Sequence, residues 1–534
     1  MRTILTIDKI SKEFGQRQLL KDVSFHVNEG DRMGLVGDNG TGKTTLIKIL
    51  MGQIEADSGQ MIWHLKGMRV GYLSQSVEQQ LDDWEKLSGG ERTKRMLVNI
   101  WKSHPQLLVL DEPTNHMDQA GVQWLIKEIR RFQGSVLVIS HDRYFLDQVT
   151  DRILEIERGK VENYRGNYTT YRKEKNHRME AKRHQFREQE KTERKIDEEI
   201  RKLRTWSAKG HRESRNHEGF KEKYRARAKK KDKQVKSQIH RLEKLKREGL
   251  QKPMEEQRIV FDFQSDPRGG KRIVEAKEIS KAFGRKTLFA NSSFTLLSGE
   301  GIGLVGSNGC GKTTFLKCLL QEVPLDHGQL RVSESAKIAT LHQDVLDLEE
   351  DQTVLAMFDI QDREKRGRLQ TLLTNMGFTK PMMNQRIGDL SLGERTRLKV
   401  AEMIVSQNNL LILDEPTNHL DLHSRERLEQ TLESYTGTLL VVSHDRYFLE
   451  KVCDKLLVFE SGRLDKVESN YEEYMQAKEQ AKDKKALDEG EKLRLGTQIA
   501  EVLSRLSLEM PGSDKYVELE VEFERLLEEK RKLG

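Results

Sequence analysis

Two nine-residue stretches carry the residue types needed to bind the phosphates of a nucleotide. Residues 37–45 read Gly-Asp-Asn-Gly-Thr-Gly-Lys-Thr-Thr, and residues 306–314 read Gly-Ser-Asn-Gly-Cys-Gly-Lys-Thr-Thr. Both fit the pattern G-x-x-x-x-G-K-[ST], in which the glycines let backbone N–H groups turn inward and the lysine reaches the β- and γ-phosphates. A chance glycine-rich turn explains one such motif poorly and two not at all. The candidate phosphate-binding residues are Gly37, Asn39, Gly40, Gly42, Lys43, Thr44, Thr45, Gly306, Asn308, Gly309, Gly311, Lys312, Thr313 and Thr314.

Each stretch is followed along the chain by polar residues that could complete a phosphate-cleaving site. Asp111-Glu112 and Asp414-Glu415 follow short apolar runs, which are predicted to be buried strands. The aspartates would lie beside a Mg²⁺ ion, and the glutamates could polarise a water molecule in line with the γ-phosphate. A purely structural pair of acidic residues is the alternative, but two identical seven-residue blocks argue against it. The further candidates are His141 and His444 for the γ-phosphate, and Gln75 and Gln343 for Mg²⁺ or water, with Thr44 and Thr313 as Mg²⁺ ligands.

These motifs recur because the chain contains two copies of one unit. Lys43 and Lys312 are 269 residues apart, and Gln75 and Gln343 are 268 apart. The block Leu-Ser-Gly-Gly-Glu (87–91) matches Leu-Ser-Leu-Gly-Glu (390–394) at a spacing of 303, so the second copy has 35 more residues in between. Leu-Asp-Glu-Pro-Thr-Asn-His and Ser-His-Asp-Arg-Tyr-Phe-Leu also recur at 303. Short apolar runs between helical stretches indicate parallel strands in an α/β fold.

The composition suits a cytoplasmic protein with long charged helices. Charged residues make up 34% of the 534 residues and aromatic residues only 6%. No run of eighteen apolar residues is present, so no membrane span is expected, and the N-terminus lacks the apolar core of a signal peptide. Cys310, Cys318 and Cys453 show no metal-binding spacing and suggest buried thiols in a reducing compartment.

A strongly basic segment separates the two copies. Residues 171–250 contain 29 Lys and Arg against 14 Asp and Glu, a net charge of +15. Residues 172–205 and 221–248 lack Gly and Pro, which predicts two long helices joined by a tip at 206–220. A solvated spacer would be balanced in charge, so the excess favours a polyanionic partner. From residue 475 the chain is again charged and predicted to be helical.

Together these motifs resemble the ATP-binding cassette family. The fold implied is α/β, with two P-loop nucleotide-binding domains joined by a long helical hairpin and followed by a helical C-terminal extension. The expected domains are 1–170, a first cassette without an inserted arm; 171–260, the basic linker; 261–475, a second cassette; and 476–534, the extension. Two cassettes in one chain without a membrane domain resemble the F subfamily, whose members act in translation.

The resemblance implies that the cassettes pair head to tail within one monomer, so that each ATP and its Mg²⁺ lie between one P-loop and the other copy's signature. The signature residues would be Ser88, Gly89, Gly90, Ser391, Gly393 and Glu394. Leu392 departs from the glycine usual at its position, although Ser391 and Gly393 are retained. Phe14 and Phe283 are expected to stack on adenine, or alternatively to belong to the core.

Three further features narrow the resemblance to antibiotic-resistance proteins of the Vml/Vga type. Only residues 76–86 separate Gln75 from Leu87, which is too short for the arm that housekeeping members carry. The long linker and the C-terminal extension also match. Such proteins bind the tRNA exit site of the bacterial 70S ribosome, next to 23S rRNA and P-site tRNA, and displace lincosamide, pleuromutilin or streptogramin A drugs. A housekeeping translation factor and the ATPase subunit of a transporter are the alternatives.

The linker tip would carry the effect on the drug. Trp206, His211, Arg212 and Phe220 are the candidate residues. Trp206 is predicted to end the first helix and pack against the second. Phe220, beside Gly219, is expected to reach deepest and to stack on RNA, or alternatively to pack on Trp206.

Overall fold

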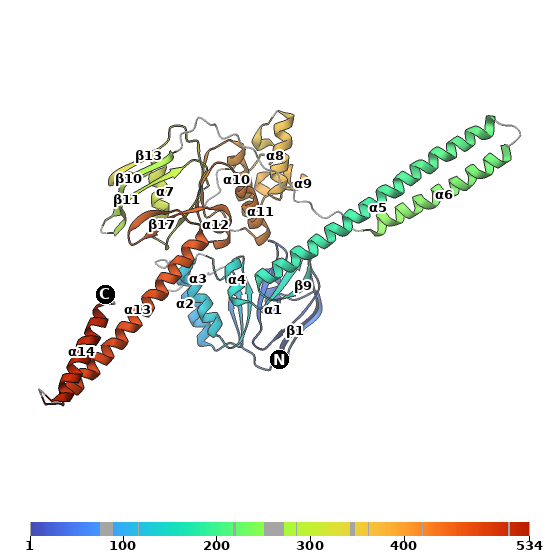
Figure 1. Ribbon diagram of the computed structural model, residues 1–534. Helices are drawn as coiled ribbons and strands as arrows, with labels where there is room; N and C mark the ends of the chain where they lie inside the picture. Colours follow the sequence, from blue (N-terminus) through green and yellow to red (C-terminus); the bar gives the residue numbers. More distant parts are fainter. Residues whose placement is uncertain are drawn as a thin grey trace. The chain divides into compact units, whose positions relative to one another are not determined.

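The computed structural model describes residues 2–15, 17–74, 89–115, 117–216, 221–249, 272–284, 286–341, 348–360, 362–418, 420–510 and 513–532. The chain forms two compact units, Met1–Ile259 with Asp421–His423, and Val260–Leu420 with Ser424–Gly534 (Figure 1). Each unit contains an α/β body and a pair of long helices.

The first unit is built on two sheets. One is antiparallel, in the order β2-β1-β4, and the other has six strands in the order β5-β6-β7-β3-β8-β9. In the six-stranded sheet all neighbours are parallel except β8 and β9. The strands are β1 (Thr3–Phe14), β2 (Arg17–Asn28), β3 (Arg32–Val36), β4 (Ser58–Trp63), β5 (Val70–Leu73), β6 (Leu107–Asp111), β7 (Ser135–Ile139), β8 (Arg152–Glu157) and β9 (Lys160–Arg165).

Successive residues of the central strands point to opposite faces of the six-stranded sheet. In β6, Leu107 and Val109 pack in a core with β1, β2 and α1, whereas Leu108 and Leu110 pack in a second core with α3 and α4. Both faces are therefore covered, which explains why these strands are apolar throughout. The helices of this body are α1 (Lys43–Leu50), α2 (Gly89–Lys102), α3 (Gln119–Arg131) and α4 (Arg143–Val149).

The second unit repeats this architecture. Its sheets have the orders β11-β10-β13 and β14-β15-β16-β12-β17-β18. The strands are β10 (Arg272–Phe283), β11 (Lys286–Leu297), β12 (Gly301–Val305), β13 (His327–Val332), β14 (Ile338–Leu341), β15 (Leu410–Asp414), β16 (Thr438–Val442), β17 (Lys455–Glu460) and β18 (Arg463–Val467). The helices that correspond to α1–α4 are α7 (Lys312–Leu319), α10 (Leu392–Val405), α11 (Leu422–Glu433) and α12 (Arg446–Val452).

The extra residues of the second copy form a small helical layer between β14 and α10. Its elements are η3 (Ala356–Phe358), α8 (Arg363–Asn375), α9 (Lys380–Met383) and η4 (Ile387–Asp389). Leu372, Met376 and Phe378 bury this layer against Leu398 and other residues of α10. The layer therefore supports the helix that begins at the predicted signature.

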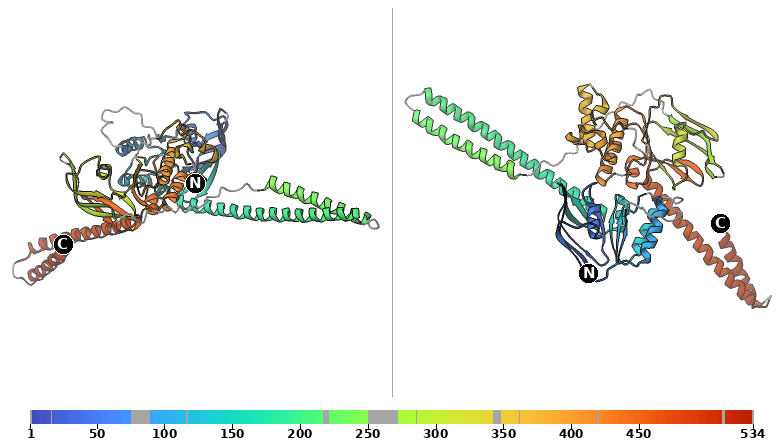
Figure 2. Two further views of the ribbon diagram at one scale, coloured as in Figure 1. Left: turned by 90° about the horizontal axis from the view of Figure 1, so that it is seen from above. Right: turned by 180° about the vertical axis from the view of Figure 1, so that it is seen from behind.

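The basic linker is a helical hairpin. Helix α5 (Tyr168–Asn216) and helix α6 (Lys221–Glu248) lie side by side in every view (Figures 1 and 2). Ile196, Ile200, Val235 and Leu242 are buried between them. At 1.5 Å per residue, the 49 residues of α5 span about 74 Å.

The prediction for the end of the first helix was wrong. Helix α5 continues eleven residues beyond Thr205, since one internal glycine costs a helix only about 1 kcal/mol. Trp206 is 72% exposed and does not pack against α6; the buried Ser207 instead donates a hydrogen bond to Asp232 of α6. Arg212 is exposed on the same helix, which also contains His211. Phe220 lies outside the described residues.

The C-terminal extension is helical, as predicted, and its two helices form another hairpin at the end of the second unit. Helix α13 (Tyr471–Leu506) and helix α14 (Asp514–Lys532) bury Leu495, Ile499, Val502 and Leu526 between them. Among the described residues, no helix is both long and apolar enough to cross a membrane.

Candidate active site

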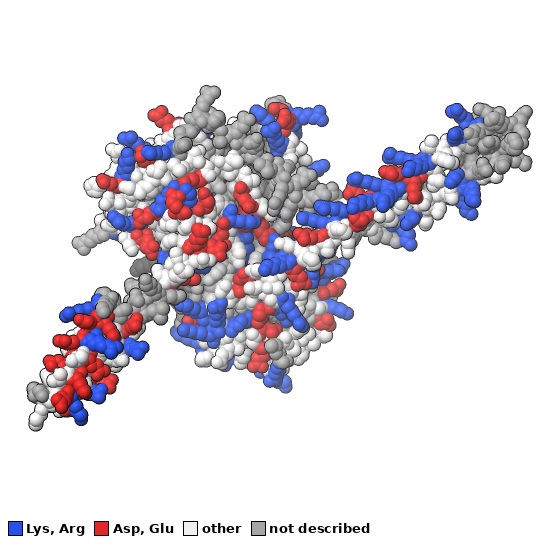
Figure 3. Space-filling view, in the orientation of Figure 1, with Lys and Arg blue, Asp and Glu red and all other residues white. Residues whose placement is uncertain are grey.

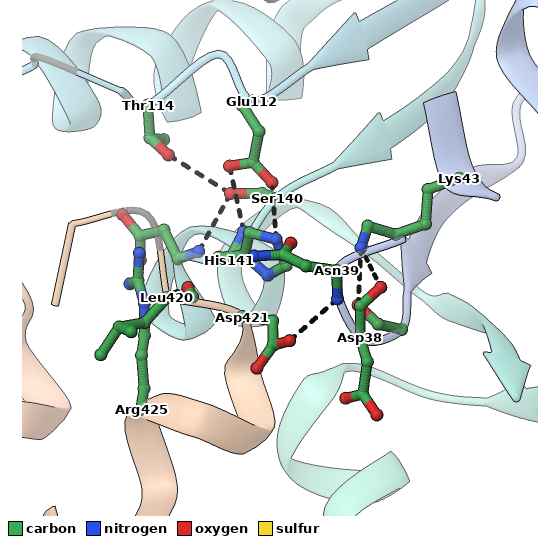
Figure 4. A network of polar contacts seen from close by, with 12 residues as sticks. Asp38, Asn39, Lys43, Glu112, Thr114, Ser140, His141, Leu420, Asp421 and Arg425 are labelled. Atoms are coloured by element: carbon green, nitrogen blue, oxygen red, sulfur yellow. Dashed lines mark hydrogen bonds and ion pairs between the residues drawn. The ribbon is translucent and has the colours of Figure 1, made fainter. Parts of the chain in front are cut away.

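The first P-loop forms a turn at the carboxyl end of β3, directly before α1. The Lys43 ammonium folds back over this turn and donates to the carbonyls of Gly37 at 2.7 Å and Asp38 at 2.9 Å (Figure 4). Gly42 caps α1 with φ = 102°, and a Cβ there would lie 2.9 Å from the Leu20 side chain. Only glycine adopts this backbone conformation without strain, and the turn it allows leads directly into α1. The first N–H groups of α1 can therefore donate hydrogen bonds to an anion bound at the turn.

The second P-loop has the same form. Lys312 donates to the carbonyls of Gly306 at 2.9 Å and Ser307 at 3.3 Å. Gly311 caps α7 with φ = 118°. Two turns with the same lysine contacts and the same left-handed glycine show that both copies can cradle phosphate.

Asp111 ends β6 beside the first P-loop and has features that suit a divalent cation. The Thr44 side chain forms a hydrogen bond with its carboxyl group. Burial raises the pKa of Asp111, and the Lys43 charge partly opposes that shift. Its Oδ2 atom is buried and has no hydrogen-bond partner among the described residues. A hydroxyl and a spare carboxylate oxygen at one place fit a hydrated Mg²⁺ ion.

Glu112 is held in a strained conformation next to Asp111. Its φ is +50°, which costs a non-glycine residue about 1–3 kcal/mol, and its N–H donates to the Ile139 carbonyl at 2.9 Å. The carboxylate accepts the His141 N–H at 3.2 Å and lies 3.4 Å from His141 Nε2 (Figure 4). Burial lowers the pKa of Lys43, and the nearby Glu112 charge partly restores it. The strained residue therefore places its carboxylate against His141, close enough for its charge to act on Lys43.

Glu415 repeats this arrangement in the second unit. Its φ is +51°, and its N–H donates to the Val442 carbonyl at 2.8 Å. Burial, followed by repulsion from Asp414, raises the pKa of Glu415 to about 8. His444 Nε2 lies 3.6 Å from the Glu415 carboxylate and 3.1 Å from the Asn308 side-chain oxygen of the P-loop. The histidine therefore connects the carboxylate to the phosphate-binding turn.

Residues that the sequence analysis did not select hold each histidine in place. Ser140 Oγ lies 3.2 Å from Thr114 Oγ and accepts the Asp142 N–H, and Asp142 in turn caps α4 (Figure 4). The second unit has the same contacts, including 3.4 Å between Thr417 and Ser443. Both sets lie inside the repeated blocks, so comparing the blocks residue by residue would have found them.

The two aromatic candidates are exposed and are not core residues. Phe14 is 51% exposed and Phe283 is 55% exposed. Each lies at the end of the first strand of its unit, in the hairpin whose next residues approach the P-loop. The alternative that they belong to the core is therefore wrong, and stacking on adenine stays a prediction.

The second signature forms a well-capped helix start. Ser391 Oγ accepts the Glu394 N–H, while the Glu394 carboxylate accepts both the N–H and the hydroxyl of Ser391 at 2.8 Å. Leu392, where glycine is usual, is 44% exposed, so its side chain does not disturb the cap. In the first copy, Gly89 and Gly90 begin α2. Ser88, Gln75 and Gln343 lie outside the described residues.

The two copies, each with a P-loop, an Asp-Glu strand end and a histidine, define a P-loop ATPase of the ATP-binding cassette class. Two family models, both described as ABC transporter, match residues 20–82 with 289–418, and 154–263. The ribosome protection protein VmlR of Bacillus subtilis is 36% identical over 98% of this chain and 97% of its own length. ABC transporter F family member 5 of Arabidopsis thaliana is 28% identical over 91% of this chain and 79% of its own.

The chain therefore belongs to the F subfamily of ATP-binding cassette proteins, as its motifs predicted. The energy-dependent translational throttle protein EttA of Mycobacterium tuberculosis is 29% identical, over 86% of this chain and 91% of its own length. Among solved structures, the RNase-L inhibitor matches with a TM-score of 0.56 at 20% identity, over 88% of this chain and 92% of its own. That likeness confirms the predicted fold of two cassettes.

Proposed function

We propose that this ATPase binds the bacterial ribosome at the tRNA exit site and protects it from drugs of the peptidyl-transferase centre. The observation that carries the proposal is the match to VmlR, whose name describes ribosome protection, over nearly the full length of both chains. The match includes the linker and the C-terminal hairpin, so it extends beyond the ATPase bodies. A cytoplasmic location accords with this role.

The charge of the linker supports an RNA partner. Lys and Arg side chains line the described part of the hairpin (Figure 3). Lys229, Lys230, Lys233 and Lys236 are all exposed on α6. A surface that presents more cations than anions to solvent attracts a phosphate backbone. We propose that this hairpin contacts 23S rRNA and P-site tRNA.

We also propose that each ATP is enclosed by one P-loop and the other copy's signature. Mg²⁺, when bound, would neutralise charge on the phosphates and would be held by Thr44 with Gln75, and by Thr313 with Gln343. The P-loop lysines and the helix N-termini bind the β- and γ-phosphates. Glu112 and Glu415 accept a proton from the attacking water; Glu415, whose pKa is raised, does so in the ionised form that the Lys312 charge favours. The histidines hold each glutamate against its P-loop.

A double variant tests the assignment of the glutamates. Glu112→Gln with Glu415→Gln preserves the side-chain shape but removes both proton acceptors. We expect this chain to bind ATP, to lose turnover by about 100-fold or more, and to stay on ribosomes during sedimentation. Normal turnover by the double variant would show that other groups activate the water.

A charge series on the ATP-trapped chain tests the linker. Changing Lys229, Lys230, Lys233 and Lys236 to Gln should weaken ribosome binding and reduce its salt dependence, by a log–log slope of about 0.7–0.9 per lost phosphate contact. The matched control changes four exposed lysines of the bodies, Lys21, Lys127, Lys160 and Lys365, to Gln. Equal effects of both sets would mean that the hairpin has no special role.

Drug susceptibility distinguishes protection from a housekeeping role. Cells that express the chain should tolerate at least one lincosamide, pleuromutilin or streptogramin A, and cells with the double-glutamine variant should not. Phe220→Ala should lower tolerance while ATP turnover and ribosome binding persist. Unchanged susceptibility to all three classes would instead favour a general translation factor.

A further inference from the structure

A partly buried lysine lies behind the exposed ring of Phe14. Lys12 Nζ lies over this ring at 5.6 Å from its centroid, and the lysine side chain is only 14% exposed. Asp57 of the loop before β4 binds the ammonium at 2.6 Å and also accepts the Glu13 N–H at 2.7 Å. These two bonds lower the pKa of Asp57, so the carboxylate stays ionised at neutral pH. One aspartate therefore fixes both the cation and the backbone next to Phe14.

The second unit contains the same cluster. Lys281 Nζ lies 5.4 Å from the centroid of Phe283, and its side chain is 8% exposed. Asp326 binds the ammonium at 2.8 Å and accepts the Ala282 N–H at 2.7 Å. Residues 10–15 and 279–284 differ at one position only, and in both copies the lysine, aspartate and phenylalanine make the same contacts.

The turn that follows each phenylalanine is tied to the P-loop. Arg17 pairs with Phe14 across the β1–β2 hairpin and donates to the Gly40 carbonyl at 3.2 Å. Lys286 pairs with Phe283 and donates to the Gly309 carbonyl at 3.1 Å. The position of the ring is therefore linked by direct bonds to the turn that holds the phosphates.

We propose that Lys12 with Asp57, and Lys281 with Asp326, are positioning residues that hold Phe14 and Phe283 as platforms for the nucleobase of ATP. This inference rests on the proposed stacking of adenine on these two rings. The lysine occupies one face of the ring through a cation–π contact, which leaves the other face to the base. Burial of the lysine is tolerated because the aspartate neutralises it.

This arrangement reduces the cost of ordering the ring when the nucleotide binds. An exposed phenylalanine that is free to change rotamer must be immobilised by the base, and that loss of freedom weakens binding. A ring that already packs on a fixed cation has lost this freedom before the nucleotide arrives. We call each lysine–aspartate pair, Lys12 with Asp57 and Lys281 with Asp326, a clamp. The clamp should strengthen the binding only of ligands that carry a base, because it touches no phosphate-binding atom.

The test compares ATP with inorganic triphosphate on the full chain in the absence of ribosomes. Lys12→Met with Lys281→Met removes both charges and keeps the apolar stems, and it alters the two sites alike. We expect ATP to bind about three- to tenfold more weakly and triphosphate to bind unchanged. Lys21→Met, the same change at an exposed residue of the neighbouring strand, should bind both ligands as wild type does.

Further variants separate the possible outcomes. Phe14→Ala with Phe283→Ala should weaken ATP by about tenfold or more, and adding the lysine changes should weaken it no further. If the phenylalanine variant binds ATP with wild-type affinity, the two rings do not stack on the base, and the inference fails as well. If the phenylalanine variant binds ATP more weakly but the lysine variant binds it with wild-type affinity, the rings do stack on the base and the positioning role of the lysines is refuted.

Equal weakening of ATP and triphosphate by the lysine variant would also overturn the inference, since it would mean general damage to the site. Asp57→Asn with Asp326→Asn provides a second route, because it keeps an acceptor for the backbone N–H while removing the charge. Its expected result is the same loss for ATP alone. Because no ribosome is present, none of these outcomes depends on the proposed role in translation.

Discussion

Replacing Glu415 with glutamine should stabilise the second unit, and by an amount that grows with pH. The carboxyl group is buried beside Asp414, and its pKa is raised from 4.5 to about 8. A raised pKa in the folded state means that the stability is complete below pH 4.5 and is lost as the pH rises toward 8. Glutamine has no charge to bury, so the variant escapes this loss.

The size of the effect follows from the pKa. Each pH unit between the unfolded and folded values corresponds to about 1.4 kcal/mol, which sets a ceiling of about 5 kcal/mol above pH 8. The side chain is still 15% exposed, and Lys312 attracts the charged form. We therefore expect a gain of about 2–3 kcal/mol at pH 8 and of less than about 0.5 kcal/mol at pH 4.5.

Hydrogen exchange of the β15 and β16 amides in the nucleotide-free chain is the suitable assay. All five tryptophans precede residue 207, so their fluorescence would report on the first unit. Comparing variant and wild type at each pH removes the intrinsic pH dependence of exchange. Glu433→Gln, the same change at an exposed residue of α11, is the control. A difference for Glu415→Gln that does not change with pH would refute the argument from burial.

Three further predictions follow from single contacts. Ser391→Ala removes the cap of α10 and should lower the local stability of that helix by about 1 kcal/mol in hydrogen exchange, whereas Ser391→Thr, which keeps the hydroxyl, should restore most of it. Ser207→Ala should destabilise the linker hairpin by about 1–2 kcal/mol, and Trp206→Ala by less than about 0.5 kcal/mol. Thermal unfolding followed by circular dichroism measures both effects. A larger effect of Trp206→Ala would show that Trp206 is the packed residue. Glu155→Ala removes the acceptor of the Tyr171 hydroxyl and the ion-pair partner of Lys175. Amide hydrogen exchange in the first turns of α5 should therefore become about 30-fold faster or more. Glu157→Ala, at a site that is 58% exposed, should leave that exchange rate unchanged.

Features encoded in short, repeated patterns were predictable from the sequence. The P-loops, the acidic strand ends and the histidines each recur in identical or near-identical blocks, and glycine requirements such as that at Gly42 are local. The family follows from the same blocks. The separation of the copies by helical segments was also readable, because 172–205 and 221–248 lack helix breakers.

Features that depend on the rotation or packing of a long helix were not predictable. Gly210 lies in the segment predicted to be the tip, but one glycine costs a helix only about 1 kcal/mol, and α5 continues through it. Trp206 was predicted to pack against the second helix, but the direction in which a residue faces depends on its position around the helix, and that position places Ser207 inward. The contacts behind Phe14 could have been predicted from the repeat, because Lys12, Arg17 and Asp57 recur as Lys281, Lys286 and Asp326 at the P-loop spacing of 269.

Because α5 is long and unbroken, a small rotation where it joins the first body produces a large displacement at its far end. The helix starts at Tyr168 on the first body, where Tyr168 and Tyr171 are buried and Glu155 binds Tyr171 and Lys175. Over about 74 Å, a tilt of only about 5° at this root moves the far end by about 6 Å, roughly the length of an amino-acid side chain. A tilt too small to disturb the packing of the ATPase body would therefore be a large displacement at the far end of the linker, and a flexible joint inserted in the middle of α5 would abolish it.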